Sequence, residues 1–229
     1  MKVVRFFLGI LLIPFCVVAT QTVRSLIVLA QPSSSGVIPP SAWALGGGFL
    51  LWLFIFFTLP RPARTYVLAH ELTHVLWASM MGARVFHMSI SKESGSVTLS
   101  KSNFLITLAP YFFPLYTVIT IIGYYVLSIF LEVEAYYLCW LALVGLTWGF
   151  HFTFTISTLL QHQSDIHECG RLFSLAVVYL LNVLGIGLWV VIVSSVTLEQ
   201  MVEFMQKNLG SFASLLWSEL DPIIEKFRQ

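Results

Sequence analysis

Residues 66–78 read YVLAHELTHVLWA, and His70-Glu71-Leu72-Thr73-His74 within them has the pattern H-E-x-x-H. Two histidines four residues apart lie on one face of a helix, where they can share a metal ion. Glu71 lies beside them as a candidate general base, since in H-E-x-x-H metalloproteases the glutamate takes a proton from water at a zinc ion. Because the flanking residues are apolar, we expect this helix to lie in or against a bilayer and to support hydrolysis there.

The composition of the whole chain indicates a polytopic membrane protein. Of its 229 residues, 58% are hydrophobic and only 10% are charged, which would leave too much apolar surface on a soluble domain. At about 20 residues per helical span, the chain has room for about five or six spans and no sizeable soluble domain. Twelve Lys and Arg against 11 Asp and Glu provide no basic field of the kind that nucleic-acid binding needs, so no nucleic-acid partner is expected.

The apolar runs predict an all-α polytopic membrane protein with about six transmembrane helices. The expected spans are 6–23, 43–59, 63–82, 104–131, 135–160 and 172–193. We interpret the first run as an uncleaved span, although a signal peptide cleaved near Ala30 is the alternative. Gly145 and Gly149 have a small-xxx-small spacing that predicts close helix packing.

Several breaks divide these runs. Pro60-Arg61-Pro62 cannot continue a helix, so a new helix is expected to begin near Ala63 and to end near Gly82. The alternating pattern of residues 84–100, with a glycine-containing turn, then predicts a small β-hairpin beside the metal site. Pro110 and Pro114 predict a kink or a short re-entrant piece.

We therefore expect three parts in the chain: an N-terminal pair of transmembrane helices in 1–62, a metalloprotease-like core in 63–193, and an amphipathic interfacial tail in 194–229. In the tail, Thr197 and Gln200 form a possible capping box. Two apolar stripes follow, and they predict amphipathic helices that lie in the membrane interface or dock on a partner protein.

A catalytic zinc ion usually has three protein ligands, so the two histidines need a third. The candidates are Asp165, His167, Glu168, Cys169, His151, His162 and His87. We choose Asp165, because a carboxylate at the end of a span is costly without a partner and because two histidines with one carboxylate suit Zn²⁺. This choice leaves Glu71 free to act as the base.

These motifs resemble the site-2 protease family of intramembrane zinc metalloproteases. His70, Glu71 and His74 match the first motif of that family, and residues 82–85 resemble the glycine and strand that follow it. Asp165 matches the second motif in type and position. It is followed by Ile166 where the family usually has glycine, so the neighbouring ligand candidates stay open. The resemblance covers roughly residues 63–193.

The resemblance implies a zinc-dependent endopeptidase that cleaves in or near the transmembrane segment of membrane-protein substrates. It also implies that the strand Val85–Ile90 adds the substrate as a further strand, with Val85, His87, Ser89 and Ile90 as candidate contacts. Asn182 is a further candidate for binding the substrate backbone, and an ordinary interhelical hydrogen bond is its alternative role.

The sequence is also compatible with two other classes of function. A catalytically silent scaffold or regulatory subunit could retain the metal site and bind a regulatory partner through its C-terminal helices, but such a protein need not keep Glu71. Lipid-modifying iron enzymes normally need more histidine boxes than six scattered histidines supply. The expected location is the bacterial cytoplasmic membrane, because the chain is compact and carries no long luminal loops, and an organellar membrane is the alternative.

Overall fold

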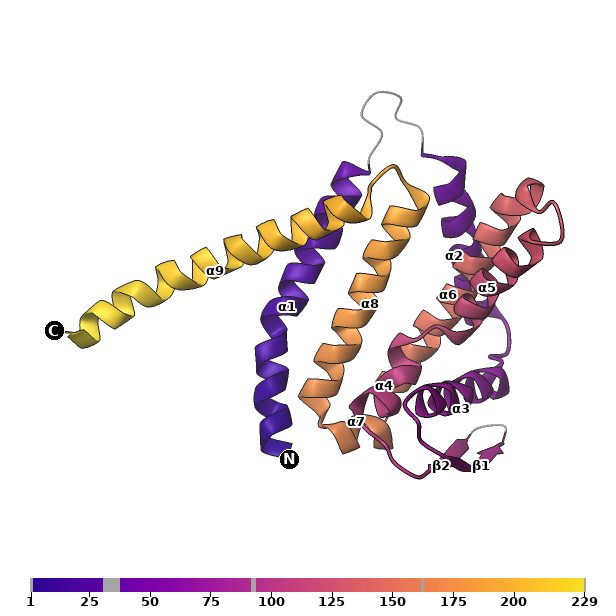
Figure 1. The fold of residues 1–229 in the computed structure, drawn as a ribbon, viewed down its shortest axis with the longest axis horizontal. Coiled ribbons are helices and arrows are strands. Elements are labelled where there is room, and N and C mark those ends of the chain that lie inside the picture. The colour runs from indigo at the N-terminus through magenta and orange to yellow at the C-terminus, as the bar shows by residue number, and fades with distance from the viewer. Residues whose placement is uncertain (1, 31–37, 92–93, 162, 229) are drawn as a thin grey trace. The chain divides into compact units, whose positions relative to one another are not determined.

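The computed structural model describes residues 2–30, 38–91, 94–161 and 163–228, and most of them are helical (Figure 1). The elements in chain order are α1 (Lys2–Leu29), α2 (Pro40–Thr58), α3 (Ala63–Met80), β1 (Val85–Ile90), β2 (Gly95–Leu99), α4 (Phe104–Phe112), α5 (Leu115–Ser128), the 3₁₀ turn η1 (Glu134–Tyr136), α6 (Tyr137–Leu159), α7 (Ser164–Cys169), α8 (Arg171–Val193) and α9 (Leu198–Arg228). The expected helical class and the β-hairpin are thus confirmed.

The chain forms two compact units. One unit combines Met1–Ile38 with Leu175–Gln229, and the other is Pro39–Ser174. The first therefore groups α1 with α9 and most of α8, whereas the second holds α2 to α7 and the hairpin. This grouping differs from the division at residues 62 and 193 expected from the sequence, because helices distant in the sequence pack together.

Four helical segments of the described residues are long and apolar enough to cross a membrane: Val3–Leu29, Pro40–Thr58, Glu134–Leu159 and Arg171–Val193. The pair α4 and α5 would supply a fifth span, but it is bent by 74° next to Pro114, as the prolines predicted. The expected count of six spans is not confirmed, because α3 is not apolar enough to be a candidate span. Its polar residues Arg64, His70, Glu71 and His74 explain why.

Helices α2 and α6 pack closely through glycines. A Cβ atom at Gly48 would overlap the backbone carbonyl of Ala142, and one at Gly145 would overlap that of Leu45. At Gly149 a Cβ would lie 3.0–3.2 Å from side-chain atoms of Trp52 and Phe49. The predicted packing role of Gly145 and Gly149 is confirmed, and these contacts bring the two backbones together where larger residues would separate them.

The helix that carries H-E-x-x-H has the ends expected from its sequence. It begins at Ala63 directly after Pro62, which lies at the N-cap, and its last residue is Met80. Gly82 follows with a φ of 67°, and the Ala83 amide donates a 2.8 Å hydrogen bond to the Ala78 carbonyl. A glycine in this left-handed conformation is a common helix end.

The hairpin lies beside α3 (Figure 1). Its antiparallel register pairs Val85 with Leu99 at one end and Ile90 with Gly95 at the other, with an irregularity between Val85 and His87. Four hydrogen bonds between Ser91 and Ser94 close the turn end, and they include Ser91 N–H to the Ser94 carbonyl at 2.8 Å and Ser94 N–H to the Ser91 hydroxyl at 3.0 Å. Residues 92 and 93 of the predicted turn lie outside the described residues.

The C-terminal tail is a single helix, α9, rather than the separate amphipathic helices that its two apolar stripes suggested. The predicted capping box is confirmed, because the Gln200 side chain accepts from Thr197 N–H at 2.9 Å and Gln200 N–H donates to the Thr197 hydroxyl at 3.2 Å. The Asn208 amide donates to the Thr22 hydroxyl of α1 at 3.1 Å. The helix continues through Gly210, although glycine is a weak helix former.

We expect Gly145→Ala to destabilise the protein by about 1–3 kcal/mol, because the added methyl group must push the backbones of α2 and α6 apart. Thermal unfolding of detergent-purified protein measures this effect. Gly123→Ala is the matched control, since a Cβ at Gly123 has no neighbour within 4 Å. Equal melting temperatures for the two variants would contradict the packing role.

Candidate metal centre

A cleft of about 740 Å³ opens beside α3 in the second compact unit. His70, Glu71 and His74 of α3 line it together with Asp165 of α7. Hydroxyl and amide side chains supply much of the remaining wall: Ser94, Ser96, Ser102, Thr107, Ser157, Thr158, Gln161, Gln163 and Ser164. The cleft wall therefore exposes polar and apolar surface in about equal parts, although the chain as a whole is strongly apolar.

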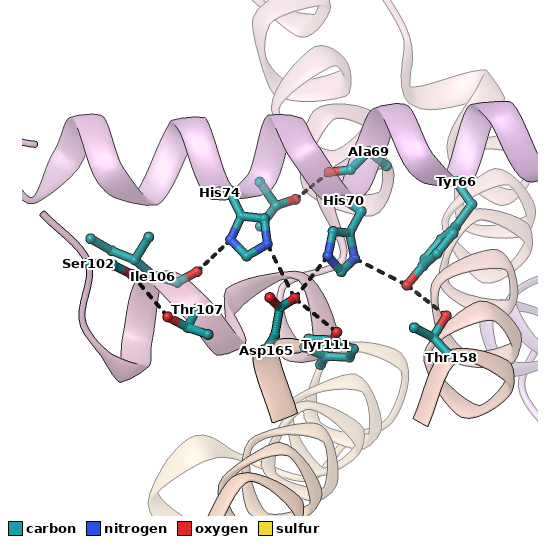
Figure 2. Close-up of polar contacts among 11 residues, drawn as sticks. Tyr66, Ala69, His70, His74, Ser102, Ile106, Thr107, Tyr111, Thr158 and Asp165 are labelled. Carbon is teal, nitrogen blue, oxygen red and sulfur yellow. Dashed lines mark hydrogen bonds and ion pairs between the residues drawn. The ribbon is translucent and has the colours of Figure 1, made fainter. Parts of the chain in front are cut away.

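His70, His74 and Asp165 form a group that could hold a metal ion (Figure 2). The Oδ2 atom of Asp165 lies 3.3 Å from Nε2 of His70 and 3.5 Å from Nε2 of His74. All three ligand atoms lie within 4.8 Å of one another. Tetrahedral zinc, with bonds of about 2.0–2.1 Å, separates its ligand atoms by about 3.3 Å. The observed separations from Asp165 fit such an ion.

The environment of His74 explains why a cation suits this group. Its Nδ1 atom lies 2.8 Å from the backbone carbonyl of Ile106; since a carbonyl only accepts, Nδ1 must carry the proton. In the neutral imidazole, Nε2 then holds a lone pair that faces the carboxylate of Asp165. Two acceptors face each other in this arrangement, so it is stable only with a cation between them. Either a metal ion or a proton on the imidazole meets that need.

Two linked hydrogen bonds orient His70. The Tyr66 hydroxyl, one helical turn earlier on α3, lies 3.2 Å from Nδ1 of His70. Thr158 of α6 donates to the same hydroxyl at 2.9 Å. With Tyr66 on Nδ1, the Nε2 atom of His70 points to Asp165 (Figure 2). Such outer contacts hold metal-binding histidines in a productive orientation.

Tyr111 of α4 holds Asp165 and packs edge-to-face against the His70 ring, with 5.3 Å between the ring centroids. Its hydroxyl donates to Oδ2 at 3.0 Å, and its side chain is fully buried. A carboxylate oxygen has two lone pairs, so Oδ2 can accept from Tyr111 and still face a cation. Sequence reasoning missed Tyr111, since no local pattern marks it. Tyr66 carried a usable signal, because it precedes His70 by four residues on the same helical face.

The ionisation of the group follows from these contacts, and neither α3 nor α7 is one of the candidate spans. Burial raises the pKa of Asp165, but hydrogen bonds to His70 and His74 outweigh burial and hold that pKa below its ordinary value. Burial lowers the pKa of His74, yet its hydrogen bond to Asp165 and the charge of that carboxylate raise it overall. The carboxylate is therefore kept negative, as a metal ligand must be.

Glu71 lines the same cleft and is only 6% exposed. Burial raises the pKa of Glu71; the two histidines lower it by a smaller amount, and the charge of Asp165 raises it further. A carboxylate with a raised pKa is a better proton acceptor than an exposed one. Glu71 lies outside the metal-binding group, so it remains available as a base.

The other candidates for the third ligand do not join the group within the described residues. Glu168 lines the cleft, and Cys169 is buried at 1% exposure. His151 of α6 is buried and lines a separate small cavity, whereas His87 is exposed on β1. His162 lies outside the described residues.

The residues predicted to contact the substrate are not those that line the cleft. The strand that lines the cleft is β2, through Gly95, Ser96, Val97 and Leu99. The β1 residues proposed from the sequence, Val85, His87, Ser89 and Ile90, are absent from the described lining. The physical reason is the pairing of the hairpin: alternation predicts strands but not which outer edge faces the site. Asn182 belongs to the other compact unit, where its amide donates to the Val178 carbonyl at 2.8 Å.

Comparisons with protein-family models, curated proteins and solved structures found no match to this chain.

We expect Tyr111→Phe to weaken metal binding by about 10–100-fold, because it removes the hydrogen bond that orients Asp165. Competition titration with a fluorescent zinc chelator measures the affinity. Tyr125→Phe is the matched control, since Tyr125 is 60% exposed on α5. Equal zinc affinity in the two variants would show that Tyr111 does not position the ligand.

Proposed function

We propose that this protein is a membrane-embedded zinc endopeptidase that cleaves membrane-protein substrates in or near a transmembrane segment. The observation that carries the proposal is the group of His70, His74 and Asp165 with Glu71 beside it, on the wall of the cleft. Four candidate spans support a membrane location for this site. The resemblance to site-2 proteases supports the same proposal. We propose that the protein lies in the bacterial cytoplasmic membrane.

Zinc is the metal that the donor set favours. Two imidazoles and one carboxylate are a common catalytic zinc set, and they leave one coordination position open. Calcium and magnesium prefer oxygen ligands and usually take more of them. The spacing of the ligand atoms also fits tetrahedral coordination, as described above.

The proposed reaction is hydrolysis of a peptide bond. A bound zinc ion would polarise the scissile carbonyl and make water more acidic. Glu71 would accept the proton of the attacking water and pass it to the departing amine. The neighbouring hydroxyl-rich walls would hold the polar backbone of a substrate in the cleft, since peptide groups need hydrogen-bond partners away from water.

The presence of β2 in the cleft wall supports an extended substrate. A helix hides its carbonyls in its own hydrogen bonds, so a transmembrane substrate must unwind before attack. Because β2 lines the cleft, we propose that the unwound segment lies along β2, in place of the β1 pairing expected from the sequence. An open strand edge at membrane depth is tolerated where it borders a polar cavity.

The first test is the zinc content of detergent-purified protein. We expect about one zinc ion per chain in the parent and a large loss in Asp165→Ala, because two histidines alone leave the site incomplete. Glu168→Ala is the control, since Glu168 lines the cleft but lies outside the ligand group. Zinc retained in Asp165→Ala, or absent from the parent, would contradict the proposed site.

A second test separates an enzyme from a silent scaffold. We expect Glu71→Gln to bind zinc like the parent and to lose at least about 100-fold in cleavage rate, the size of a typical general-base effect. Tagged single-span model proteins, reconstituted with the purified protein in liposomes, serve as substrates. Zinc binding without any cleavage by the parent would favour the scaffold or regulatory role over the enzyme.

A further inference from the structure

Gly95, the first residue of β2, lies against the side chain of Glu71. A Cβ atom built at Gly95 would lie 2.5 Å from both Cγ and Oε1 of Glu71 and 2.8 Å from its Cδ. Real Cβ atoms essentially never approach another heavy atom closer than 3.0 Å. Any side chain at position 95 would therefore compete with the Glu71 carboxylate for the same space.

Space, and not backbone conformation, is the reason for glycine at this position. Among the described residues, glycines with positive φ are Gly82 and Gly170, so the backbone of Gly95 suits an ordinary L-residue. Its position is also restrained, because it pairs with Ile90 in the last rung of the hairpin. The Ser91 and Ser94 hydrogen bonds close the turn just beyond that rung. These bonds fix Gly95 within the hairpin, and Leu99 of the same strand packs against the buried cluster of Ala78, Ala83 and Ile106.

We infer that Gly95 is a positioning residue for Glu71: the bare backbone at the start of β2 forms the wall that leaves room for this carboxylate beside the two histidines. The catalytic consequence rests on the proposed function, in which Glu71 is the base. The contact itself does not depend on any activity. Both residues line the cleft, and the Glu71 side chain is nearly buried there.

The inference predicts a specific defect for Gly95→Ala. The end of the Glu71 side chain is its flexible part, so the added methyl group should displace the carboxylate and leave the α3 backbone in place. The three heavy atoms nearest to this methyl group all belong to Glu71 and none to a metal ligand. Displacement of a catalytic group by about 1 Å can cost about 100-fold in rate.

The first experiment compares the parent, Gly95→Ala and the control Gly123→Ala in zinc content and in cleavage of the reconstituted single-span proteins. We expect Gly95→Ala to keep its zinc and its KM while kcat falls about 100-fold. The control should match the parent, because position 123 has open space around it. An unchanged kcat in Gly95→Ala, or loss of its zinc, would overturn the inference.

A double-mutant cycle in melting temperature tests the contact without relying on activity. We expect Gly95→Ala to lower Tm by about 2–4 °C in the parent. The same change should have almost no effect in Glu71→Ala, where the competing side chain is gone. An equal lowering of Tm in both backgrounds would show that Gly95 and Glu71 are not in contact.

A parent protein that neither binds zinc nor cleaves would contradict the proposed function. The double-mutant cycle would still decide whether Gly95 adjoins Glu71.

Discussion

One carboxylate oxygen facing two imidazole nitrogens is the interaction on which the candidate site depends. Oδ2 of Asp165 lies 3.3 Å from His70 and 3.5 Å from His74, and this contact joins α7 to α3 across 95 residues of sequence. A partly buried anion needs a positive partner, and two fixed imidazoles alone do not supply one while they are neutral. The group could therefore hold a metal ion, and a proton on His74 is the other way to meet the same need.

The contacts behind the ligands show how a short, bent segment becomes part of the site. The bend of 74° between α4 and α5 leaves α4 as a short helix that carries both Ile106 and Tyr111. The carbonyl of Ile106 fixes the proton of His74, and the hydroxyl of Tyr111 holds Asp165. Both contacts therefore come from one short helix, and they reach two different ligands, His74 and Asp165.

Helix α6 joins the apolar packing of the second unit to its cleft. Helices α2 and α6 are held together by glycine contacts and by the aromatic cluster of Trp52, Phe56, Phe150 and Phe154. Ser157 and Thr158 of α6 line the cleft together with residues of α3, α7 and β2. A strand edge beside the cleft can offer its backbone groups to a peptide instead of exposing them to lipid. The same closeness leaves no room for a side chain at Gly95.

The sequence by itself determined the features that depend on neighbouring residues. It predicted the H-E-x-x-H helix with ends near Ala63 and Gly82, the hairpin, the break near Pro114 and the glycine packing of α6, because proline, glycine and periodicity act locally. The choice of Asp165 came from the cost of an unpaired carboxylate, and the structure brings it to the histidines. Only the tertiary structure decided that β2 lines the cleft, that Tyr111 holds Asp165, that α3 is not a candidate span and that Gly95 adjoins Glu71. These features depend on which surfaces meet after the chain has packed, and no local pattern encodes a contact between residues so far apart in sequence.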